Sequence, residues 1–147
     1  YAISNKNGES LFYINRHDLT SSLNNINHEN IFLKFKSKLF GVKSKDMIKK
    51  KVRVKIITLN NLLKKNKIKQ LDLVKIDTEG HEFQVLQGIG RSIQKIKIVL
   101  IEFRNDNVYK NYNPSKIHNN LIKNNFYLAK IFKFPFTTWE DRIYIQK

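Results

Sequence analysis

The chain has 147 residues, 41% of them hydrophobic, which is enough for one domain with a core of its own. It has no cysteine, which excludes disulfides and thiolate metal sites. Its net charge is +16, and residues 34–69 hold fourteen Lys and Arg against one acid, Asp46, so a basic nucleic-acid-binding module has to be considered. Lys outnumbers Arg by 23 to 5, whereas Arg is favoured for bidentate contacts to bases and phosphates. We therefore favour a solvated, lysine-rich face.

The N-terminal third predicts strands and loops. Short strands are expected at residues 1–4 and 11–15, and the Asn and Gly residues at 5–8 tolerate the positive φ of a tight hairpin between them. Residues 16–30 are polar and rich in Asn, which is typical of a loop. Residues 32–51 have no clean period and are expected to be irregular or partly helical.

A strand and a capped helix follow. Val52–Ile56 alternates apolar with basic residues, which predicts a strand with one buried face. Thr58 is a suitable N-cap for a short helix that continues through Leu63.

The most informative stretch is Leu71–Glu82, which reads LDLVKIDTEGHE. Its apolar first half predicts a strand buried on both faces, as in a parallel sheet. Asp77 then ends the strand, Gly80 permits a tight turn, and a helix is expected to open at His81. The positive end of the helix dipole would favour the two acids of this turn, Glu79 and Glu82.

A second apolar run, residues 98–101, ends in an acid, Glu102. Residues 78–96 separate the two runs, which is enough for the helical crossover that parallel strands require. Neighbouring strands lie about 4.8 Å apart, so Asp77 and Glu102 are expected side by side at the carboxyl edge, where open α/β sheets bind ligands. Glu102 would be desolvated there and need a partner, for which Arg104 and Lys75 are the candidates.

The C-terminal part predicts a helix and a closing pair of strands. Asn113-Pro114 is typical of a helix start, and its apolar stripe would be Ile117, Leu121 and Ile122. Strands are expected at 126–132 and 142–146. The aromatic loop at 134–139 could cover an acceptor pocket, although folding onto the core is the commoner outcome for such residues.

Several of these motifs together resemble the C-terminal half of FkbM-type methyltransferases. KIDTEGHE at 75–82, VLQG at 85–88 and Ile-Glu at 101–102 match the family pattern K-I-D-x-E-G-x-E, x-V-L-x-G and a later I-E. Thr58-Leu59 looks like the T-L-D-D-L element of the family, with Asn where the family has acids, and residues 20–23 are similar to a Ser-Ser-Leu element. This last match would place Ser21 and Ser22 on the active-site side.

The resemblance implies an α/β fold: the C-terminal part of a Rossmann-like (class I) methyltransferase sheet, mostly parallel with a closing antiparallel hairpin. Residues 1–147 would be a single, partial domain that lacks the N-terminal, cofactor-binding half, because the glycine-rich turn and the strand-end acid that hold the cofactor in such enzymes are missing. Gly88-Ile89-Gly90 follows a helix and is better explained as a helix C-cap. The cofactor site would lie mostly outside this chain, and the chain alone is expected to be inactive.

The resemblance also implies the activity: transfer of a methyl group from S-adenosylmethionine to a hydroxyl on a sugar, glycan or other natural product, with a cytoplasmic location expected. Asp77 is the candidate base, and Glu79 and Glu102 would shape the acceptor side. His81, near a helix N-terminus, could serve as a neutral base, although a surface histidine is the simpler interpretation.

Two rival functions remain from the residues themselves. A divalent-metal-dependent hydrolase, such as a phosphodiesterase or nuclease, would use Asp77, Glu79 and Glu102 as oxygen ligands. The lack of a clustered histidine or a fourth acid argues against it. The basic nucleic-acid-binding module would show binding that depends steeply on salt.

Overall fold

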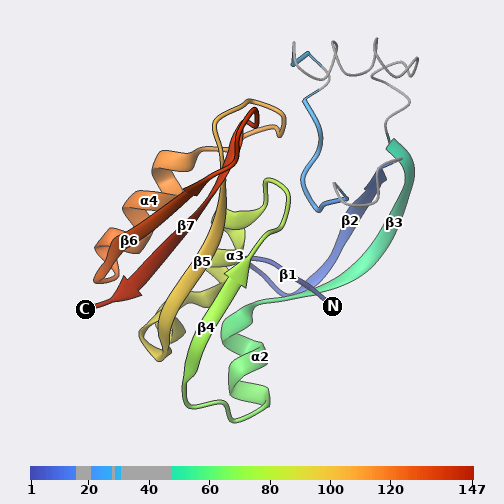
Figure 1. The fold of residues 1–147 in the computed structure, drawn as a ribbon. Helices are drawn as coiled ribbons and strands as arrows, with labels where there is room; N and C mark the ends of the chain where they lie inside the picture. The colour runs from blue at the N-terminus through green and yellow to red at the C-terminus, as the bar shows by residue number, and fades with distance from the viewer. Residues whose placement is uncertain (16–20, 28, 31–47) are drawn as a thin grey trace.

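The structure, a computed structural model, describes residues 1–15, 21–27, 29–30 and 48–147. These residues form two sheets with helices packed beside them, as Figure 1 shows. The α/β prediction is therefore confirmed. Part of the loop expected at 16–30, and most of the irregular segment expected at 32–51, lie outside the described residues.

The first sheet has three strands in the order β1-β3-β2: Ala2–Ile3, Ile48–Ile57 and Gly8–Asn15. β3 pairs in parallel with β1 and antiparallel with β2, so it separates the two strands that were expected to form a hairpin. That hairpin prediction is wrong. The long β3, which contains the predicted strand at Val52–Ile56, pairs along the whole of β2, whereas β1 has only two residues with which to pair.

The short helix α2, Leu59–Lys65, begins as predicted. The Thr58 hydroxyl accepts a hydrogen bond from the backbone N–H of Asn61 at 3.2 Å, which satisfies one of the free donors at the helix start.

The second sheet has four strands in the order β4-β5-β7-β6, with the bounds Leu71–Ile76, Ile96–Arg104, Trp139–Gln146 and Phe126–Lys133. β4 and β5 are parallel, whereas β7 runs antiparallel to both β5 and β6. The parallel pair and the closing hairpin are confirmed. The mostly parallel sheet is not found, because β7 pairs antiparallel with β5 as well as with β6, which leaves β4 and β5 as the parallel pair of this sheet.

β4 is an edge strand of this sheet, and the prediction that it is buried on both faces is wrong. Val74 and Ile76 face the core, but Leu73 and Lys75 are exposed on the opposite side. The continuous apolar run does not distinguish a central strand from an edge strand, because it contains no information on which other strands and helices cover it.

The helices α3 (Glu82–Ile89) and α4 (Pro114–Lys123) and the 3₁₀-helix η3 (Gly90–Lys95) provide the other half of the core. Alternate residues of β5 that pack in this core are completely buried: Val99, Ile101 and Phe103. Side chains alternate along a strand, so Glu102 and Arg104 lie on the opposite face. The core thus fixes where these two charged groups emerge.

The helix ends follow their local signals. Gly90 is the C-cap of α3 with φ +52, which confirms the C-cap interpretation of the Gly-Ile-Gly stretch. The Asn113 side chain accepts a hydrogen bond from the Lys116 N–H at 3.0 Å and caps α4 as expected. In the predicted apolar stripe of α4, Ile117 and Leu121 are buried, but Ile122 is exposed.

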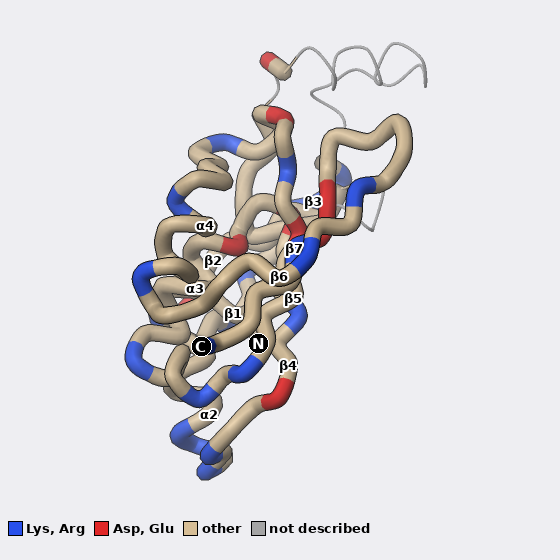
Figure 2. Tube along the Cα trace, turned by 60° about the vertical axis from the view of Figure 1, so that its left-hand side comes forward, with Lys and Arg blue, Asp and Glu red and all other residues tan. Residues whose placement is uncertain are grey.

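The basic residues of the described chain are spread over strands and helices, as Figure 2 shows. In β3, exposed Lys and Arg side chains alternate with more buried apolar ones, an arrangement typical of a solvated strand face. Residues 34–47 of the basic segment lie outside the described residues. Among the helices that the structure describes, none is long and apolar enough to cross a membrane.

Candidate active site at the carboxyl edge of β4 and β5

The turn after β4 has a strained backbone. Glu79 has φ +53 and Gly80 has φ +90, both in the left-handed region that residues other than glycine rarely adopt. A Cβ atom on Gly80 would lie 2.4 Å from Cγ of Tyr109, so this position has no room for any side chain. The glycine therefore serves two purposes: it permits the turn and it allows the Tyr109 ring to pack on it.

Glu82 holds the turn from inside. Its Oε1 accepts hydrogen bonds from the Thr78 N–H at 3.0 Å, the Thr78 hydroxyl at 3.2 Å and the Gly80 N–H at 3.0 Å. The residue is 2% exposed, and burial raises the pKa of its carboxyl group, while these donors oppose the rise. The sequence indicated only a favourable dipole interaction for Glu82, whereas its main contribution is to organise the turn.

A second segment holds the turn from outside. The Ser22 hydroxyl donates to the Thr78 carbonyl at 2.9 Å, and the Asn24 side-chain amide donates to the Gly80 carbonyl at 2.6 Å. Of the two serines that the family resemblance brought to the active-site side, Ser22 does contact the acidic turn. Ser21 instead accepts a hydrogen bond from the Asn15 N–H at 3.1 Å.

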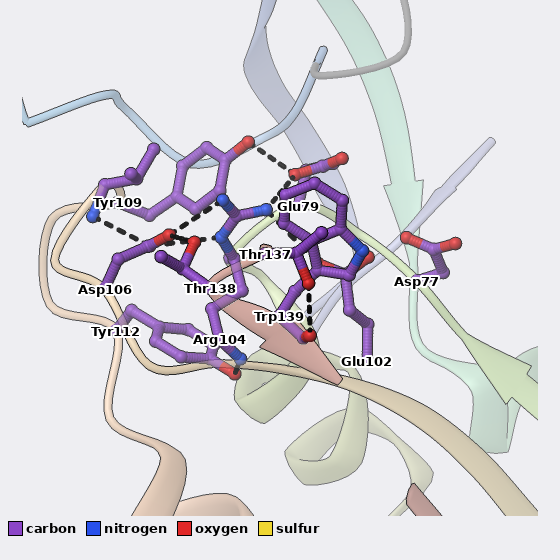
Figure 3. A network of polar contacts seen from close by, with 12 residues as sticks. Asp77, Glu79, Glu102, Arg104, Asp106, Tyr109, Tyr112, Thr137, Thr138 and Trp139 are labelled. Atoms are coloured by element: carbon purple, nitrogen blue, oxygen red, sulfur yellow. Dashed lines mark hydrogen bonds and ion pairs between the residues drawn. The ribbon is translucent and has the colours of Figure 1, made fainter. Parts of the chain in front are cut away.

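Three predicted site residues come together at this edge of the sheet. One carboxylate oxygen from each of Asp77, Glu79 and Glu102 lies within 4.8 Å of the others, so the predicted proximity of Asp77 and Glu102 is confirmed. The Asp77 side chain, 37% exposed, forms an ion pair with Lys75 at 2.9 Å. Glu79 and Glu102 are more enclosed, at 15% and 13%. The three residues form what we call the carboxylate cluster, shown in Figure 3.

Arg104, at the end of β5, is the main positive charge beside this cluster. Its guanidinium lies 3.5 Å from Glu79, 3.3 Å from Glu102 and 3.0 Å from Asp106 (Figure 3). Burial by itself would lower the pKa of Arg104, but Asp106 first, and then Tyr109 and Glu79, raise it overall. Of the two partners expected for Glu102, Arg104 is therefore the one found, and Lys75 pairs with Asp77 instead.

Aromatic rings enclose Arg104. The centroids of the Tyr109 and Trp139 rings lie 5.4 and 5.6 Å from its guanidinium carbon, within the range of cation–π attraction. The Tyr109 hydroxyl also donates to Glu79 at 2.6 Å, and the Tyr112 hydroxyl accepts from the Arg104 N–H at 3.0 Å. The sequence showed two tyrosines just after Glu102 but did not reveal these contacts.

Two further acids, both missed in the sequence, lie near the cluster. Asp106 binds Arg104 and accepts hydrogen bonds from the Thr138 hydroxyl and the Val108 N–H. Asp141 is the register partner of Glu102 on β7. Among the described residues, three acids lie close enough to share a metal ion, and neither Asp106 nor Asp141 belongs to that group. For Asp141 the sequence offers no signal, because only the β5–β7 register brings it beside Glu102.

Burial and mutual repulsion change the proton affinity of the enclosed carboxyl groups. Burial first, and then the charge of Glu79, raises the pKa of Glu102 to about 8, with Arg104 opposing. Burial also raises the pKa of Glu79, against the hydrogen bond from Tyr109 and the charge of Arg104. The cluster therefore holds a proton near neutral pH, which suits groups that give and take protons.

His81 faces a different neighbour. Its Nε2 lies 2.9 Å from the Ser4 hydroxyl, and its buried Nδ1 has no hydrogen-bond partner among the described residues. Burial lowers the pKa of His81 to about 4, so the ring is neutral at physiological pH. The side chain is half-buried. The structure does not bring it into the carboxylate cluster.

The aromatic loop after β6 divides into two parts. Trp139 packs over Arg104, whereas the Phe134 and Phe136 side chains are exposed. The expectation that this loop folds onto the core is therefore wrong for the two phenylalanines.

Comparison with known proteins agrees with the motifs found in the sequence. The family model of the methyltransferase FkbM domain matches residues 1–129. The chain belongs to the FkbM methyltransferase family. It is also similar to the hexuronic acid methyltransferase AglP of Haloferax volcanii, with 33% identity over 49 residues, which is 33% of this chain and 20% of that relative. No solved structure matches the chain.

Two places in the described part of this FkbM domain bear on where a ligand could bind. At the glycine turn that follows the parallel strand β4, the Tyr109 ring packs directly against Gly80 and occupies the space beside it. An open hollow of about 600 Å³ at β3 and α2 is lined by Lys55, Lys64 and Lys65 among others, and contains none of the predicted site residues. The carboxylate cluster could hold a divalent cation, because carboxylate oxygens suit Mg²⁺ and Ca²⁺.

Proposed function

We propose that this FkbM domain takes part in methyl transfer from S-adenosylmethionine to a hydroxyl group of a sugar, glycan or other natural product. The observation that carries the proposal is the carboxylate cluster at the carboxyl edge of β4 and β5, in a chain that belongs to a methyltransferase family. The similarity to a hexuronic acid methyltransferase supports a sugar-like acceptor.

Asp77 is the residue we assign to the acceptor proton. It directly follows β4 and is the most exposed member of the cluster, so an acceptor can reach its carboxylate. S-adenosylmethionine supplies the methyl group when bound. The acceptor oxygen gives up its proton as it forms the new bond to carbon, and Asp77 accepts or orients that proton.

Glu79 and Glu102 shape the acceptor side in this proposal. Arg104 and Tyr109 fix the Glu79 carboxylate, and Arg104 also contacts Glu102. A protonated Glu102 can donate a hydrogen bond to an acceptor oxygen, whereas an ionised one can accept from a second hydroxyl. The neighbouring hydroxyls of a sugar ring match such an arrangement of alternating donors and acceptors.

We assign His81 no proton transfer, because its ring contacts Ser4 and its pKa lies far below neutrality. A neutral imidazole with such a pKa is a weak base at pH 7. His81 instead joins the start of α3 to the end of β1, since Ser4 directly follows that strand.

Methyl transfer is best tested in the polypeptide that carries these residues in the cell, with radiolabelled S-adenosylmethionine and a panel of glycosides. Replacing a general base typically lowers the rate by about 10²–10⁴-fold, so Asp77→Asn is expected to lose activity in that range. Asp72→Asn is the matched control, because Asp72 lies on the same strand with its side chain 84% exposed. Label that enters no hydroxyl, or full activity of Asp77→Asn, would contradict the proposal.

The donor site forms a separate part of the proposal. We infer that these 147 residues alone do not bind S-adenosylmethionine with useful affinity, and so act as a partial domain. The filled glycine turn at Gly80 supports this inference. Calorimetric titration of the isolated chain is expected to show no binding at micromolar concentrations, and a micromolar dissociation constant would overturn the inference.

A second candidate function is divalent-metal-dependent hydrolysis, which the oxygen atoms within 4.8 Å and the nearby Asp106 favour. Hydrolysis of a phosphodiester that is abolished by a chelator and restored by Mg²⁺ or Mn²⁺ would support it. Methyl transfer unaffected by chelator would exclude a metal requirement. The basic nucleic-acid-binding alternative predicts binding to DNA that falls steeply with salt and does not depend on Asp77.

A further inference from the structure

The turn between β6 and β7 places a phenylalanine where the backbone favours glycine. The Thr137 N–H and hydroxyl both donate to the Phe134 carbonyl, at 3.3 and 2.9 Å, and close a four-residue turn around Pro135 and Phe136. Phe136, the third residue of the turn, has φ +61. Turns with proline second and a positive φ third normally carry Gly or Asn there, because those residues tolerate the left-handed region.

The same residue has an unusually exposed side chain. Phe136 is 108% exposed relative to a reference residue, and nothing in the described part of the chain covers its ring. Phe134 is 43% exposed on the other side of the proline. The fold therefore accepts both backbone strain and exposed aromatic surface at one place, without a compensating contact among the described residues.

Two lysines, Lys130 and Lys133, lie in the strand that leads to these rings. β6 ends with Lys130, Ile131, Phe132 and Lys133, all exposed, and the Lys130 ammonium lies 4.9 Å from the Phe132 ring centroid. The sequence from 130 to 139 contains no acid, although the register of β7 places Glu140 opposite Lys133 and Asp141 opposite Phe132. The next acid, Glu140, is buried and accepts a hydrogen bond from Arg142 at 2.7 Å. We call residues 130–136 the aromatic tip.

The base of the turn is fixed to the candidate active site. The Asn105 N–H donates to the Thr138 carbonyl at 2.7 Å, the Thr138 hydroxyl donates to Asp106, and Trp139 packs over Arg104. These contacts fix the base of the turn. Beyond it, the Phe134 and Phe136 side chains are exposed.

We propose that the aromatic tip binds the surface of a lipid bilayer that contains anionic lipids. Exposed aromatic rings gain free energy in the boundary layer between headgroups and acyl chains, and neighbouring lysines are attracted to anionic headgroups while their stems lie along the apolar surface. A purely apolar pocket on a protein would accept the rings but would leave Lys130 and Lys133 without acidic partners. The proposal does not depend on methyl transfer.

The experiment measures binding of the chain to two kinds of vesicle. The anionic vesicles contain phosphatidylcholine with about 30% phosphatidylglycerol, and the neutral vesicles contain phosphatidylcholine alone. We compare the wild type with the double variant Phe134→Ser/Phe136→Asn. The matched control is Ile122→Asn, which removes an exposed apolar side chain from α4, beyond the opposite end of β6. The chain has a single tryptophan, Trp139, next to the tip, so quenching of its fluorescence by brominated lipids reports insertion.

The wild type is expected to bind anionic vesicles, and the double variant to bind at least about tenfold more weakly, which corresponds to 1.4 kcal/mol. The control variant should bind as the wild type does, and brominated lipid should quench Trp139 only when both phenylalanines are present. Binding that is equal in the wild type and the double variant would overturn the proposal, because the net charge alone would then explain it. No vesicle binding by the wild type, or the same loss in the control variant, would also overturn it.

Discussion

The turn after β4 and the turn after β6 share a backbone feature and differ in what compensates for it. Glu79 and Phe136 both have a positive φ without being glycine, at +53 and +61. Such strain costs on the order of 1–3 kcal/mol per residue and persists where the surroundings stabilise it. Around Glu79 the stabilising contacts are visible: the Tyr109 hydroxyl and the Arg104 guanidinium bind its carboxylate. Around Phe136 the two Thr137 hydrogen bonds close the turn, but no described residue covers the Phe136 ring. The comparison indicates that contacts within the fold stabilise the strained residue of the first turn. For the second turn, the proposed membrane contact would supply the missing stabilisation.

The largest expected effect comes from removing the carboxylate that holds the first turn. Glu82→Ala leaves the buried N–H groups of Thr78 and Gly80 without their acceptor, and each such group costs about 1–3 kcal/mol. We expect a loss of about 3–5 kcal/mol in the free energy of unfolding, measured by denaturant titration. Asp72→Ala, an exposed acid, should change it by less than about 0.5 kcal/mol. Equal stabilities for the two variants would show that the turn does not depend on Glu82.

Gly80→Ala tests the packing of the same turn. Its new Cβ would lie 2.4 Å from the Tyr109 ring at a backbone φ of +90, so we expect destabilisation of about 2–4 kcal/mol. Gly90→Ala is the matched control: Gly90 also has a positive φ, but no atom lies within 4 Å of its would-be Cβ. It should cost only the backbone strain, on the order of 1–3 kcal/mol, without the added clash. A cost at Gly80 no greater than at Gly90 would mean that Tyr109 moves away easily.

Glu102→Gln tests the charge at this edge of the sheet. Since the folded-state pKa of Glu102 is raised to about 8, the folded chain holds its proton more tightly than the unfolded chain does. This group therefore lowers stability progressively as the pH rises from about 5 to 8. The variant should lose this pH dependence of the free energy of unfolding. At pH 8 it should be more stable than the wild type by about 1–3 kcal/mol, which corresponds to one to two pKa units. Denaturant titrations at pH 5 and 8 measure the free energy of unfolding of both proteins. The same pH dependence in Glu102→Gln as in the wild type would contradict the prediction.

The smallest effect is expected at the second turn. Asn tolerates a positive φ, so Phe136→Asn should raise the free energy of unfolding by about 0.5–1 kcal/mol. Phe134→Ser, at a position without positive φ, should bring no such gain. The strained phenylalanine would then be a residue that weakens the fold while strengthening the proposed membrane contact. A clear loss of stability in Phe136→Asn would show that the ring has a contact within the protein.

The sequence by itself determined features that depend on residues close in the chain. Thr58 and Asn113 cap the helices that follow them, Gly90 ends α3, and a strand followed by acids and a glycine predicted the edge where Asp77 meets Glu102. These signals are reliable because caps and tight turns are made by hydrogen bonds and φ preferences within a few residues. The family motifs within 75–102 were readable for the same reason.

Only the tertiary structure decided which strands pair and which charges meet. β3 separates β1 from β2, β4 lies at an edge, and β7 brings Asp141 beside Glu102. Arg104 gathers its acids and rings from the turn after β4, the loop after β5 and the start of β7. Strand pairing depends on the competition among all strands for the same edges, and desolvation depends on what finally covers a group. Neither quantity is contained in a local run of residues, so the cluster could be located from the sequence, but its proton affinity and its partners could not.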